Sequence, residues 1–392
     1  MMPLEHLDRD ALARGLDECG ADGWLLFDFK GLNPVAARLL QLGGLGSRRL
    51  FVYLPKSGEP VALAHKIELQ PLRDFPGQVI PYARWQELHE ALGAIVKGRT
   101  LAMEISPEDA VPYLDRVPFG VVELIRRLGG TVVPSAPLVT TFTARWSEAE
   151  LADHLAAAEI LATVAREEVG RAVREAGQGL TEWTMYRRVV ARIEAAGLVI
   201  DHGPIVAFGA NAANPHYEPA EASSATLQAD QVVLLDLFAG RQAGGVQADQ
   251  TWMGFAGTQV PERVQTVWTT VRDARDAALA LVRQRTAAGA VLRGFEVDRA
   301  ARDVIEGAGF GEWFVHRTGH SIDRDLHGSG PHMDDYETRD DRELIPGIGF
   351  SVEPGIYLSG DFGVRSEVNV FLAPGGARVT PDRIQRDLIL PS

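Results

Sequence analysis

Hydrophobic and polar positions in the first third of the chain alternate in short blocks, typical of a mixed α/β unit. Short apolar runs bounded by Gly, Pro or Asn predict strands, here at residues 24–28, 50–54, 61–64 and 131–133. Leu, Ala and Val at helical spacing predict helices, here over residues 7–18, 85–95 and 107–127. We therefore expect an α/β domain over residues 1–143, and we find no catalytic constellation in it.

A change of pattern near Trp146 predicts a domain boundary. Ser147 is followed three residues later by Glu150, a capping-box signature that opens an Ala-, Glu- and Arg-rich helix to about residue 175. The pattern beyond it predicts helices over about 181–196, 261–285 and 296–308, and strands near 204–208, 231–239, 246–255, 349–358 and 363–372. The second domain is therefore expected to cover residues 144–392.

Composition and charge narrow the classes of protein. An apolar content of 46% with 23% charged residues is that of a globular protein with a sizeable core. The net charge of −14 repels nucleic acid and anionic lipid, so we expect neither as a partner. Cys19 is the only cysteine, which excludes an intrachain disulfide and a thiolate metal site. No secretory signal and no apolar run of ~20 residues is present, so a cytoplasmic location is expected.

Two aspartates lie in otherwise uncharged strands that follow one another. Asp236 lies within QVVLLDLFAG, and Asp249 lies within GGVQADQTWMGF. Each alone is explained by an acid at a strand end that binds turn amides. Two buried carboxylates on adjacent strands of one hairpin would raise each other's pKa, unless a cation lies between them. The pair therefore favours a metal site.

Histidines and two glutamates extend the candidate site. The segment VHRTGHSIDRDLHGSGPHMDD holds four of the ten histidines, His316, His320, His327 and His332; imidazole suits Zn, Mn, Co and Fe. No HExxH pattern is present, so a zincin is not indicated, and spacing alone leaves open which histidine binds metal.

Glu353 follows a strand in GFSVEPGIY, before a Pro-Gly turn, and Glu367 falls in the next strand, in FGVRSEVNVFL. Arg365 and Glu367, two apart in a strand, would face one pocket together. An ordinary Arg–Glu pair on an exposed strand remains the alternative.

In this order the motifs resemble the creatinase, aminopeptidase P and methionine aminopeptidase superfamily, the pita-bread metallopeptidases of family M24. The likeness covers nearly the whole chain and is strongest to the branch of Xaa-Pro dipeptidases (prolidases) and Xaa-Pro aminopeptidases. It implies an α/β (α+β) fold, with an N-terminal creatinase-type domain followed by a C-terminal pita-bread catalytic domain. It also implies two divalent cations per subunit, Mn²⁺ or Co²⁺ with Zn²⁺ as a further option, and a homodimer.

The resemblance also implies roles for individual residues. Asp236 would bind one metal, Asp249 and Glu367 would bridge both, and His320 and Glu353 would bind the second, with Glu353 as general base. His216, in NPHY, would contact the substrate, and His327, in DLHG, would stabilise the tetrahedral intermediate. His316 would line the proline pocket, and Arg365 would lie near the bridging glutamate and the substrate. The family's usual GHGIGLxxHExP is here GHSIDRDLHGSGP, so we expect an altered loop near His327.

These roles predict hydrolysis of the Xaa–Pro bond in dipeptides. Two cations that share a water would lower its pKa, and Glu353 would pass its proton to the leaving nitrogen. A dipeptide ends in a carboxylate, and Arg48 or Arg49 could bind it. An aminopeptidase P that acts on longer peptides is the alternative. A metal-free binding protein or a creatinase-like hydrolase is a remote one, because all five ligand positions are filled.

Overall fold

The computed structural model describes residue 4, residues 7–41 and residues 46–391. Contacts between Cα atoms divide the chain into two compact units, Met1–Thr143 and Ala144–Ser392. Each unit is described by itself. Within the described residues, no helix is long and apolar enough to cross a membrane.

The first unit is built on a six-stranded sheet in the order β4-β3-β2-β1-β5-β6. The strands are β1 (Gly23–Asp28), β2 (Leu50–Pro55), β3 (Val61–His65), β4 (Gln78–Tyr82), β5 (Thr100–Met103) and β6 (Thr131–Pro134). Along β1, Trp24 and Leu26 point into one hydrophobic cluster, whereas Leu25 and Phe27 point into another. The sheet is therefore covered on both faces, by helices α1 (Arg9–Cys19), α2 (Pro34–Leu40), α3 (Trp85–Val96), α4 (Phe119–Arg127) and α5 (Ala136–Val139).

The predicted strands of this unit are confirmed, but the helix predicted over residues 107–127 is confirmed only from Phe119 to Arg127 and is wrong before it. Short 3₁₀ turns occupy Pro107–Asp109 and Pro112–Leu114, and a regular α-helix begins only after Pro118. Each proline lacks the N–H that an interior helical position must donate, so the chain breaks at each one. Strands β4 and β5 and helix α2 were not predicted.

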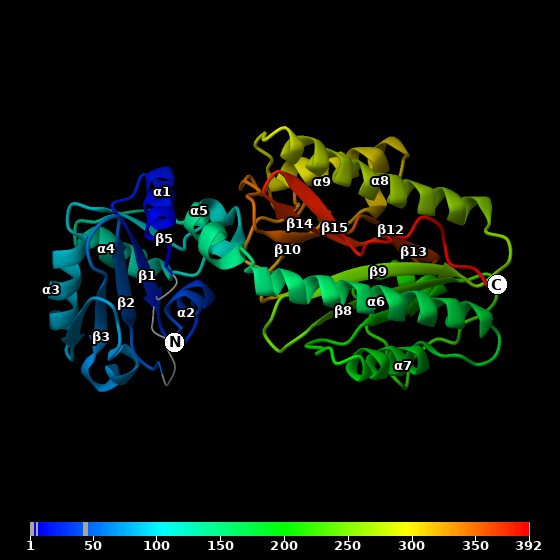
Figure 1. Cartoon of the computed structure of the whole chain (residues 1–392), viewed down its shortest axis with the longest axis horizontal. Helices are drawn as coiled ribbons and strands as arrows, with labels where there is room; N and C mark the ends of the chain where they lie inside the picture. The colour runs from blue at the N-terminus through cyan, green and yellow to red at the C-terminus, as the bar shows by residue number, and fades with distance from the viewer. Residues whose placement is uncertain (1–3, 5–6, 42–45, 392) are drawn as a thin grey trace. The chain divides into compact units, whose positions relative to one another are not determined.

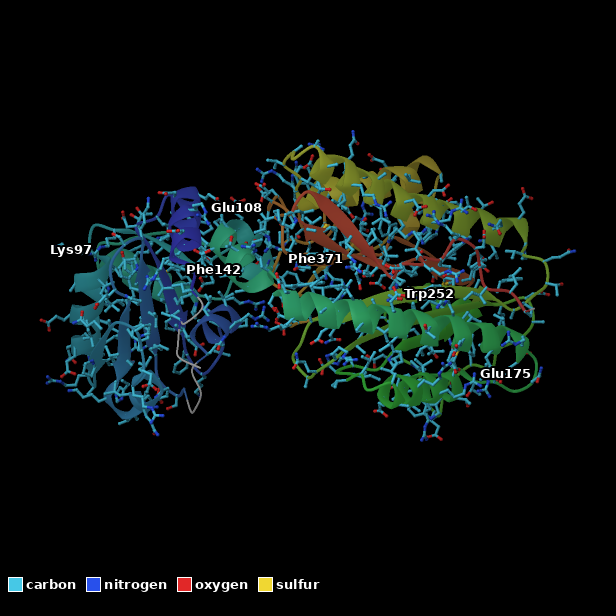
Figure 2. The ribbon with its side chains drawn as sticks, viewed as in Figure 1. Lys97, Glu108, Phe142, Glu175, Trp252 and Phe371 are labelled. Atoms are coloured by element: carbon cyan, nitrogen blue, oxygen red, sulfur yellow. The ribbon has the colours of Figure 1, made fainter. Side chains whose placement is uncertain are left out.

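The second unit begins with helix α6 (Glu148–Arg174), and its predicted capping box is confirmed. The Ser147 amide donates to Glu150 Oε2 (2.8 Å), and the Glu150 amide donates to Ser147 Oγ (3.2 Å). Helix α6 packs along β8 (Val232–Gly240) and β9 (Gln247–Phe255), around Trp252 (Figures 1 and 2). Helix α7 (Glu182–Ala195) and strand β7 (Ile205–Phe208), which pairs with β8, complete this layer.

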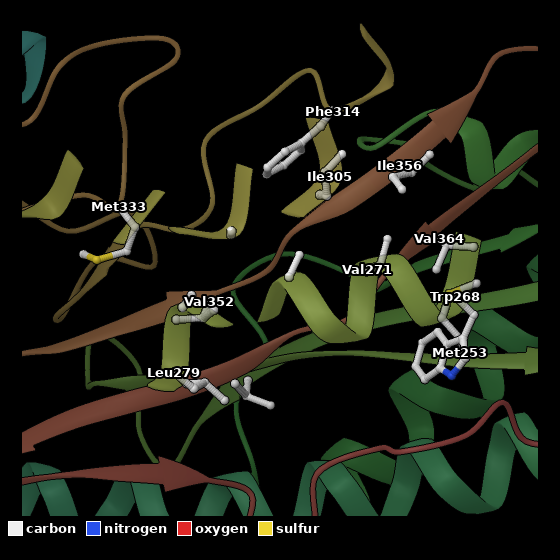
Figure 3. Close-up of a cluster of buried hydrophobic side chains, with 14 of the residues drawn as sticks. Met253, Trp268, Val271, Leu279, Ile305, Phe314, Met333, Val352, Ile356 and Val364 are labelled. Carbon is white, nitrogen blue, oxygen red and sulfur yellow. The ribbon is translucent and has the colours of Figure 1, made fainter. Parts of the chain in front are cut away.

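A second layer of strands and helices closes the unit. Its strands are β10 (Ser321–Ile322), β11 (Gly349–Val352), β12 (Gly355–Leu358), β13 (Phe362–Arg365), β14 (Val368–Ala373) and β15 (Gly376–Thr380). Helices α8 (Glu262–Ala287) and α9 (Gly294–Gly307) lie side by side over these strands (Figure 1). A hydrophobic core between the layers joins residues far apart in sequence, such as Met253, Trp268 and Val352 (Figure 3).

Two of the strands predicted as continuous are interrupted. Strand β11 ends at Val352 and β12 begins at Gly355, while β13 ends at Arg365 and β14 begins at Val368. Strand β11 pairs with β14, and β12 pairs with β13, so the two breaks lie opposite each other. Pro354 has no N–H for a ladder, but its carbonyl oxygen accepts from the Ser366 amide across the break (3.3 Å). Both predicted site glutamates lie at these breaks.

Candidate metal centre

A cavity of about 870 Å³ opens in the second unit. Every site residue predicted from the sequence lines it except Arg48, which belongs to the first unit. The predicted residues in its wall are His216, Asp236, Asp249, His316, His320, His327, Glu353, Arg365 and Glu367. They come from β8, β9, β13, the two strand breaks and three loops, so the fold gathers segments between residues 216 and 367, about two fifths of the chain.

The two aspartates lie on one face of the β8–β9 hairpin. In the antiparallel register Asp236 pairs with Thr251, and Phe238 pairs with Asp249. Because alternate residues of a strand share a face, both carboxylates point to the same side. Both are buried. The Asp249 amide donates to the side-chain oxygen of Asn369 on β14 (2.9 Å), which ties the hairpin to the second layer.

His320 lies between the carboxylates, immediately before β10. Its amide donates to Ser351 Oγ (3.0 Å), and its Nδ1 lies 3.2 Å from the Ser321 carbonyl oxygen. Its Nε2 lies 3.4 Å from Asp249 Oδ2 and 3.5 Å from Glu353 Oε1. A proton on Nδ1 can donate to the carbonyl, and the Nε2 lone pair then faces the acids. Burial also lowers the pKa of His320 and favours this neutral form.

The two glutamates leave their strands at the opposed breaks. Ser351 Oγ donates to Glu353 Oε1 (3.2 Å), and Thr251 Oγ1 donates to Glu367 Oε2 (2.8 Å). The prediction that Glu367 lies within a strand is wrong, so the same-face argument that placed it beside Arg365 does not apply. Arg365 and Glu367 nevertheless both line the cavity.

Arg365 forms its ion pair with Asp236 and not with Glu367. Its Nε donates to Thr251 Oγ1 (2.9 Å), and its Nη1 donates to the Pro215 carbonyl oxygen (3.2 Å). The guanidinium is buried. It therefore links β9, the loop around Pro215 and the carboxylate of Asp236 in one network.

Burial makes the ionised acids costly. It raises the pKa of Asp236 to about 7 and that of Asp249 to about 7. It also raises the pKa of Glu353, and it raises the pKa of Glu367 well above its usual range. The Arg365 charge opposes these shifts. One guanidinium does not compensate four carboxylates, so the cluster favours additional positive charge.

The donor set fits divalent cations. Three buried carboxylate oxygens, Asp236 Oδ1, Asp249 Oδ1 and Glu367 Oε1, have no hydrogen-bond partner within the described residues. Ligand atoms of Asp249, His320 and Glu367 lie within 4.8 Å of one another. A buried oxygen without a partner is costly, and several carboxylates with one imidazole are ligands that Mn²⁺, Co²⁺ and Zn²⁺ accept. The arrangement can therefore hold metal.

The four clustered histidines divide into two groups. His316, His320 and His327 line the cavity, whereas His332 is buried beside Ser321, whose amide donates to its Nδ1 (3.2 Å). The His327 ring lies edge-on to His320, with centroids 4.3 Å apart. The Nδ1 of His316 lies 2.7 Å from the Arg317 carbonyl oxygen. Three of the four thus face the site, a division that spacing alone left open.

The altered loop near His327 has a structural explanation. The Asp323 carboxylate accepts from the amides of Asp325 (2.9 Å) and Ser329 (3.0 Å), which closes the loop on itself. A Cβ at position 328 would lie 2.6 Å from Asp323 Oδ2. Asp323 and Gly328, two departures from the usual motif, therefore depend on each other, because the Asp323 carboxylate occupies the space that a side chain at position 328 would need.

Sequence reasoning missed three residues of the site. Thr251 contacts Arg365 and Glu367, Ser351 contacts His320 and Glu353, and the Tyr357 hydroxyl lies 2.8 Å from His316 Nε2. Thr251 could have been found, because it lies two residues after Asp249 on the same strand face. Ser351 and Tyr357 belong to strands on either side of a break that the pattern did not reveal.

Arg48 lies in the first unit and is exposed, with its Nη1 donating to the Ser47 carbonyl oxygen (3.1 Å). Part of the Gly-rich loop before it, residues 42–45, lies outside the described residues. Its proposed contact with a substrate stays a prediction.

Comparisons with known proteins identify the family. The model of metallopeptidase family M24 matches residues 153–374. The probable dipeptidase PepE of Mycobacterium tuberculosis is 31% identical over 297 residues, 70% of this chain and 74% of that protein. The Xaa-Pro dipeptidase of Lactobacillus helveticus is 36% identical over 163 residues, 42% of this chain and only 40% of that protein.

Solved structures show the same fold over nearly the whole chain. The dipeptidase PepE of Mycobacterium ulcerans matches with a TM-score of 0.74 at 24% identity, covering 98% of this chain and 97% of that one. The Xaa-Pro dipeptidase of Bacillus anthracis matches with a TM-score of 0.65 at 21% identity, covering 97% and 98%. The predicted fold class and family are confirmed: this chain belongs to metallopeptidase family M24 and has its α/β pita-bread architecture.

Proposed function

We propose that this chain is an Xaa-Pro dipeptidase that uses two divalent cations. The observation that carries the proposal is the convergence of three unpartnered, buried carboxylate oxygens with the Nε2 of His320 at one cavity wall. Membership of a metallopeptidase family supports metal-dependent hydrolysis. The Xaa-Pro dipeptidase of Lactobacillus helveticus and the dipeptidases named PepE support the substrate class.

In this proposal Asp236 and Asp249 would hold one cation, and His320 and Glu353 would hold the other. Asp249 and Glu367 would contribute ligands to both. Bound there, the cations would polarise the scissile carbonyl and supply a nucleophile from water near neutral pH. Mn²⁺ or Co²⁺ suits the oxygen-rich set, and Zn²⁺ is a further candidate.

Glu353 is the proposed general base and acid. Its Oε1 accepts from Ser351 Oγ and lies 3.5 Å from His320 Nε2, which fixes the carboxylate at the cavity wall. Burial raises its pKa, so the carboxylate can accept a proton from water. It can then pass that proton to the proline nitrogen as the bond breaks.

Substrate contacts are proposed for the histidines that surround these acids. His316 and Val315 line the cavity and are proposed to contact the proline ring. The Tyr357 hydroxyl, hydrogen-bonded to His316 Nε2 (2.8 Å), would hold the imidazole in place. His216 and His327 lie on exposed parts of the wall, where they can reach the peptide carbonyl. The structure shows Arg365 bonded to Asp236, so we propose that it holds this ligand beside the substrate.

A small substrate panel tests the proposal. Ala-Pro, Met-Pro, Ala-Pro-Ala and Ala-Ala would be assayed with metal-depleted enzyme reloaded with Mn²⁺, Co²⁺ or Zn²⁺. The proposal expects Ala-Pro and Met-Pro to be cleaved only after a metal is added. Preferential cleavage of Ala-Ala, or full activity in metal-depleted enzyme, would contradict it.

An aminopeptidase P that acts on longer peptides is the second candidate. The cavity of about 870 Å³ in the second unit lies at the upper end of the range for small-molecule sites and leaves room beyond a dipeptide. Faster cleavage of Ala-Pro-Ala than of Ala-Pro in the same panel would select this candidate.

We also propose that the chain forms a homodimer and that Arg48 or Arg49 binds the substrate's carboxylate. Light scattering on a size-exclusion column tests the first. A shift in the preference for Ala-Pro over Ala-Pro-Ala in an Arg48→Ala variant tests the second.

A further inference from the structure

Glu182 is a buried acid that lies outside the cavity and has no part in the proposed chemistry. It is the first residue of α7, and its side chain is shielded from solvent. Its Oε1 accepts from the Phe208 amide (2.8 Å) and from Asn211 Nδ2 (3.0 Å). Its Oε2 accepts from the Tyr217 hydroxyl (2.7 Å) and from the Ala225 amide (2.8 Å). Buried carboxylates are costly unless both oxygens are satisfied, and here both are.

All four donors lie in one segment, residues 208–225, which begins at the last residue of β7 and covers most of the connection to β8. Phe208 and Ala225 are its two ends, and Asn211 and Tyr217 lie between them. Asn211 Nδ2 also donates to the Tyr217 hydroxyl oxygen (3.0 Å). A loop of this length would ordinarily be mobile, but one carboxylate fastens it at four points.

His216 lies in this segment next to one of the fastened residues. On one side, Tyr217 is bonded to Glu182. On the other side, the Pro215 carbonyl accepts from Arg365 Nη1 (3.2 Å), and Nη2 of the same guanidinium pairs with Asp236. The imidazole of His216 is exposed and lines the cavity. The backbone on both sides of His216 is therefore fixed, once from α7 and once from the metal centre.

We propose that Glu182 and Tyr217 are positioning residues that hold His216 towards the substrate. The inference rests on the substrate contact proposed for His216. A side chain that contacts a reacting peptide must be held within about 0.5 Å of its productive position. Exposed His216 gains little from core packing, so its placement depends on the backbone around it. Glu182 and the four groups that donate to it, from Phe208, Asn211, Tyr217 and Ala225, form what we call the Glu182 clamp. This clamp constrains the backbone from outside the cavity.

The Tyr217 hydroxyl is suited to a permanent role as donor. Burial and the adjacent Glu182 carboxylate raise its pKa above the ordinary value for tyrosine. The phenol therefore keeps its proton across the working pH range. Tyr217→Phe removes both hydrogen bonds of this hydroxyl, the one donated to Glu182 and the one accepted from Asn211, without changing the size of the ring. It leaves the other donors of Glu182 in place, which makes it a mild probe of these contacts.

A double-mutant cycle on kcat/KM for Ala-Pro tests whether the clamp acts through His216. Tyr217→Phe is compared in the wild-type background and in the His216→Ala background. The loss of the two hydrogen bonds of the Tyr217 hydroxyl predicts a fall of at least about fivefold in the wild type, and no further fall in His216→Ala. An equal fall in both backgrounds would mean a general structural effect and would overturn the inference.

Tyr53→Phe is the matched control, because its hydroxyl donates to a backbone carbonyl, that of Asp22 (3.3 Å), in the first unit. This substitution should cost less stability than Tyr217→Phe, because it removes one bond to a neutral acceptor, and it should keep kcat/KM. If the wild type cleaves another member of the panel instead, that peptide serves for the cycle, so the choice of substrate and the positioning role are tested separately.

Amide hydrogen exchange supplies a readout that does not require activity. Peptides covering residues 209–225 should exchange faster in Tyr217→Phe and in Glu182→Gln than in wild type, with no such change in Tyr53→Phe. Unchanged exchange in this segment would overturn the inference even if the enzyme is active. Wild-type enzyme that cleaves no peptide of the panel would refute the proposed function, and the exchange result would still decide whether the clamp exists.

Discussion

Removing divalent cations should lower the thermal stability of this protein, because the metal centre buries unpaired negative oxygens. Three such oxygens belong to Asp236, Asp249 and Glu367. A buried acceptor without a partner costs about 1–3 kcal/mol, and a charged one costs more. Three of them therefore cost at least about 3 kcal/mol in the metal-free protein. At about 2–4 °C per kcal/mol for a unit of this size, metal should raise the melting temperature by at least about 6 °C.

The effect should depend on pH, with a sign that follows from the raised pKa values. Burial raises the pKa of Asp236 and Asp249 to about 7, from 3.8. Between these values the folded, metal-free protein binds more protons than the unfolded chain, so its stability falls as pH rises from about 4 to 7. Metal binding needs the deprotonated acids. The stabilisation by metal should therefore be larger at pH 7.5 than at pH 5.5.

Thermal melting by circular dichroism, with EDTA-treated protein before and after addition of Mn²⁺, measures the effect. Glu367→Gln should lose most of the shift. Asp298→Asn is the matched control, because Asp298 is a buried acid paired with Arg302 (3.0 Å) outside the cavity. It should lower the melting temperature and keep the metal-induced shift. A wild-type shift below about 2 °C, or an undiminished shift in Glu367→Gln, would refute the reasoning.

Four further predictions concern single residues. Glu353→Gln should lower kcat for Ala-Pro by about 10²–10⁴-fold, as loss of a general base does; a fall of less than tenfold in steady-state assays would contradict its role. His216→Ala should lower kcat/KM by about tenfold, as expected for the loss of one contact with the substrate. Unchanged kinetics would show that His216 does not contact the substrate. Arg48→Ala should reduce the preference for Ala-Pro over Ala-Pro-Ala. An unchanged ratio of the two rates would show that Arg48 does not bind the carboxylate of the dipeptide. Burial lowers the pKa of His154 to about 4, so between about pH 6.5 and pH 4 the unfolded chain binds a proton at this histidine and the folded chain does not. In urea unfolding, the stability advantage of wild type over His154→Gln should therefore shrink by about 3 kcal/mol from pH 7 to pH 4. A constant advantage would contradict this.

Hydrophobic periodicity was a good guide to the second unit because its helices carry clear signals. The Ser147–Glu150 capping box and the long apolar faces of α6 and α8 are local features, and local features can be read without the fold. The prolines at 107, 112 and 118 broke a helix that periodicity alone favoured. The breaks after Val352 and Arg365 were missed because they reflect strand pairing in the folded chain and not the local sequence pattern. The pairing partners change at these points, from β11 with β14 to β12 with β13.

The candidate site was predictable residue by residue, but its network was not. Acids set in apolar strands stand out in a sequence, because burial makes them costly. Hydroxyl groups do not stand out: Ser351 and Tyr357 lie in ordinary strand segments, and only the folded chain shows what they contact. The ion pair of Arg365 was not predicted for a related reason, since the fold brings Asp236 to the guanidinium from a strand 129 residues away.

Metal stoichiometry is the most direct test of a two-metal centre. Purified protein would be stripped with a chelator, reloaded with Mn²⁺, passed through a desalting column and analysed for metal by mass spectrometry. A two-metal centre predicts two ions per chain for wild type and a clear loss in Asp249→Asn, which removes one of the carboxylates proposed to serve both ions. One ion per chain or none in wild type, or two ions retained in Asp249→Asn, would contradict it.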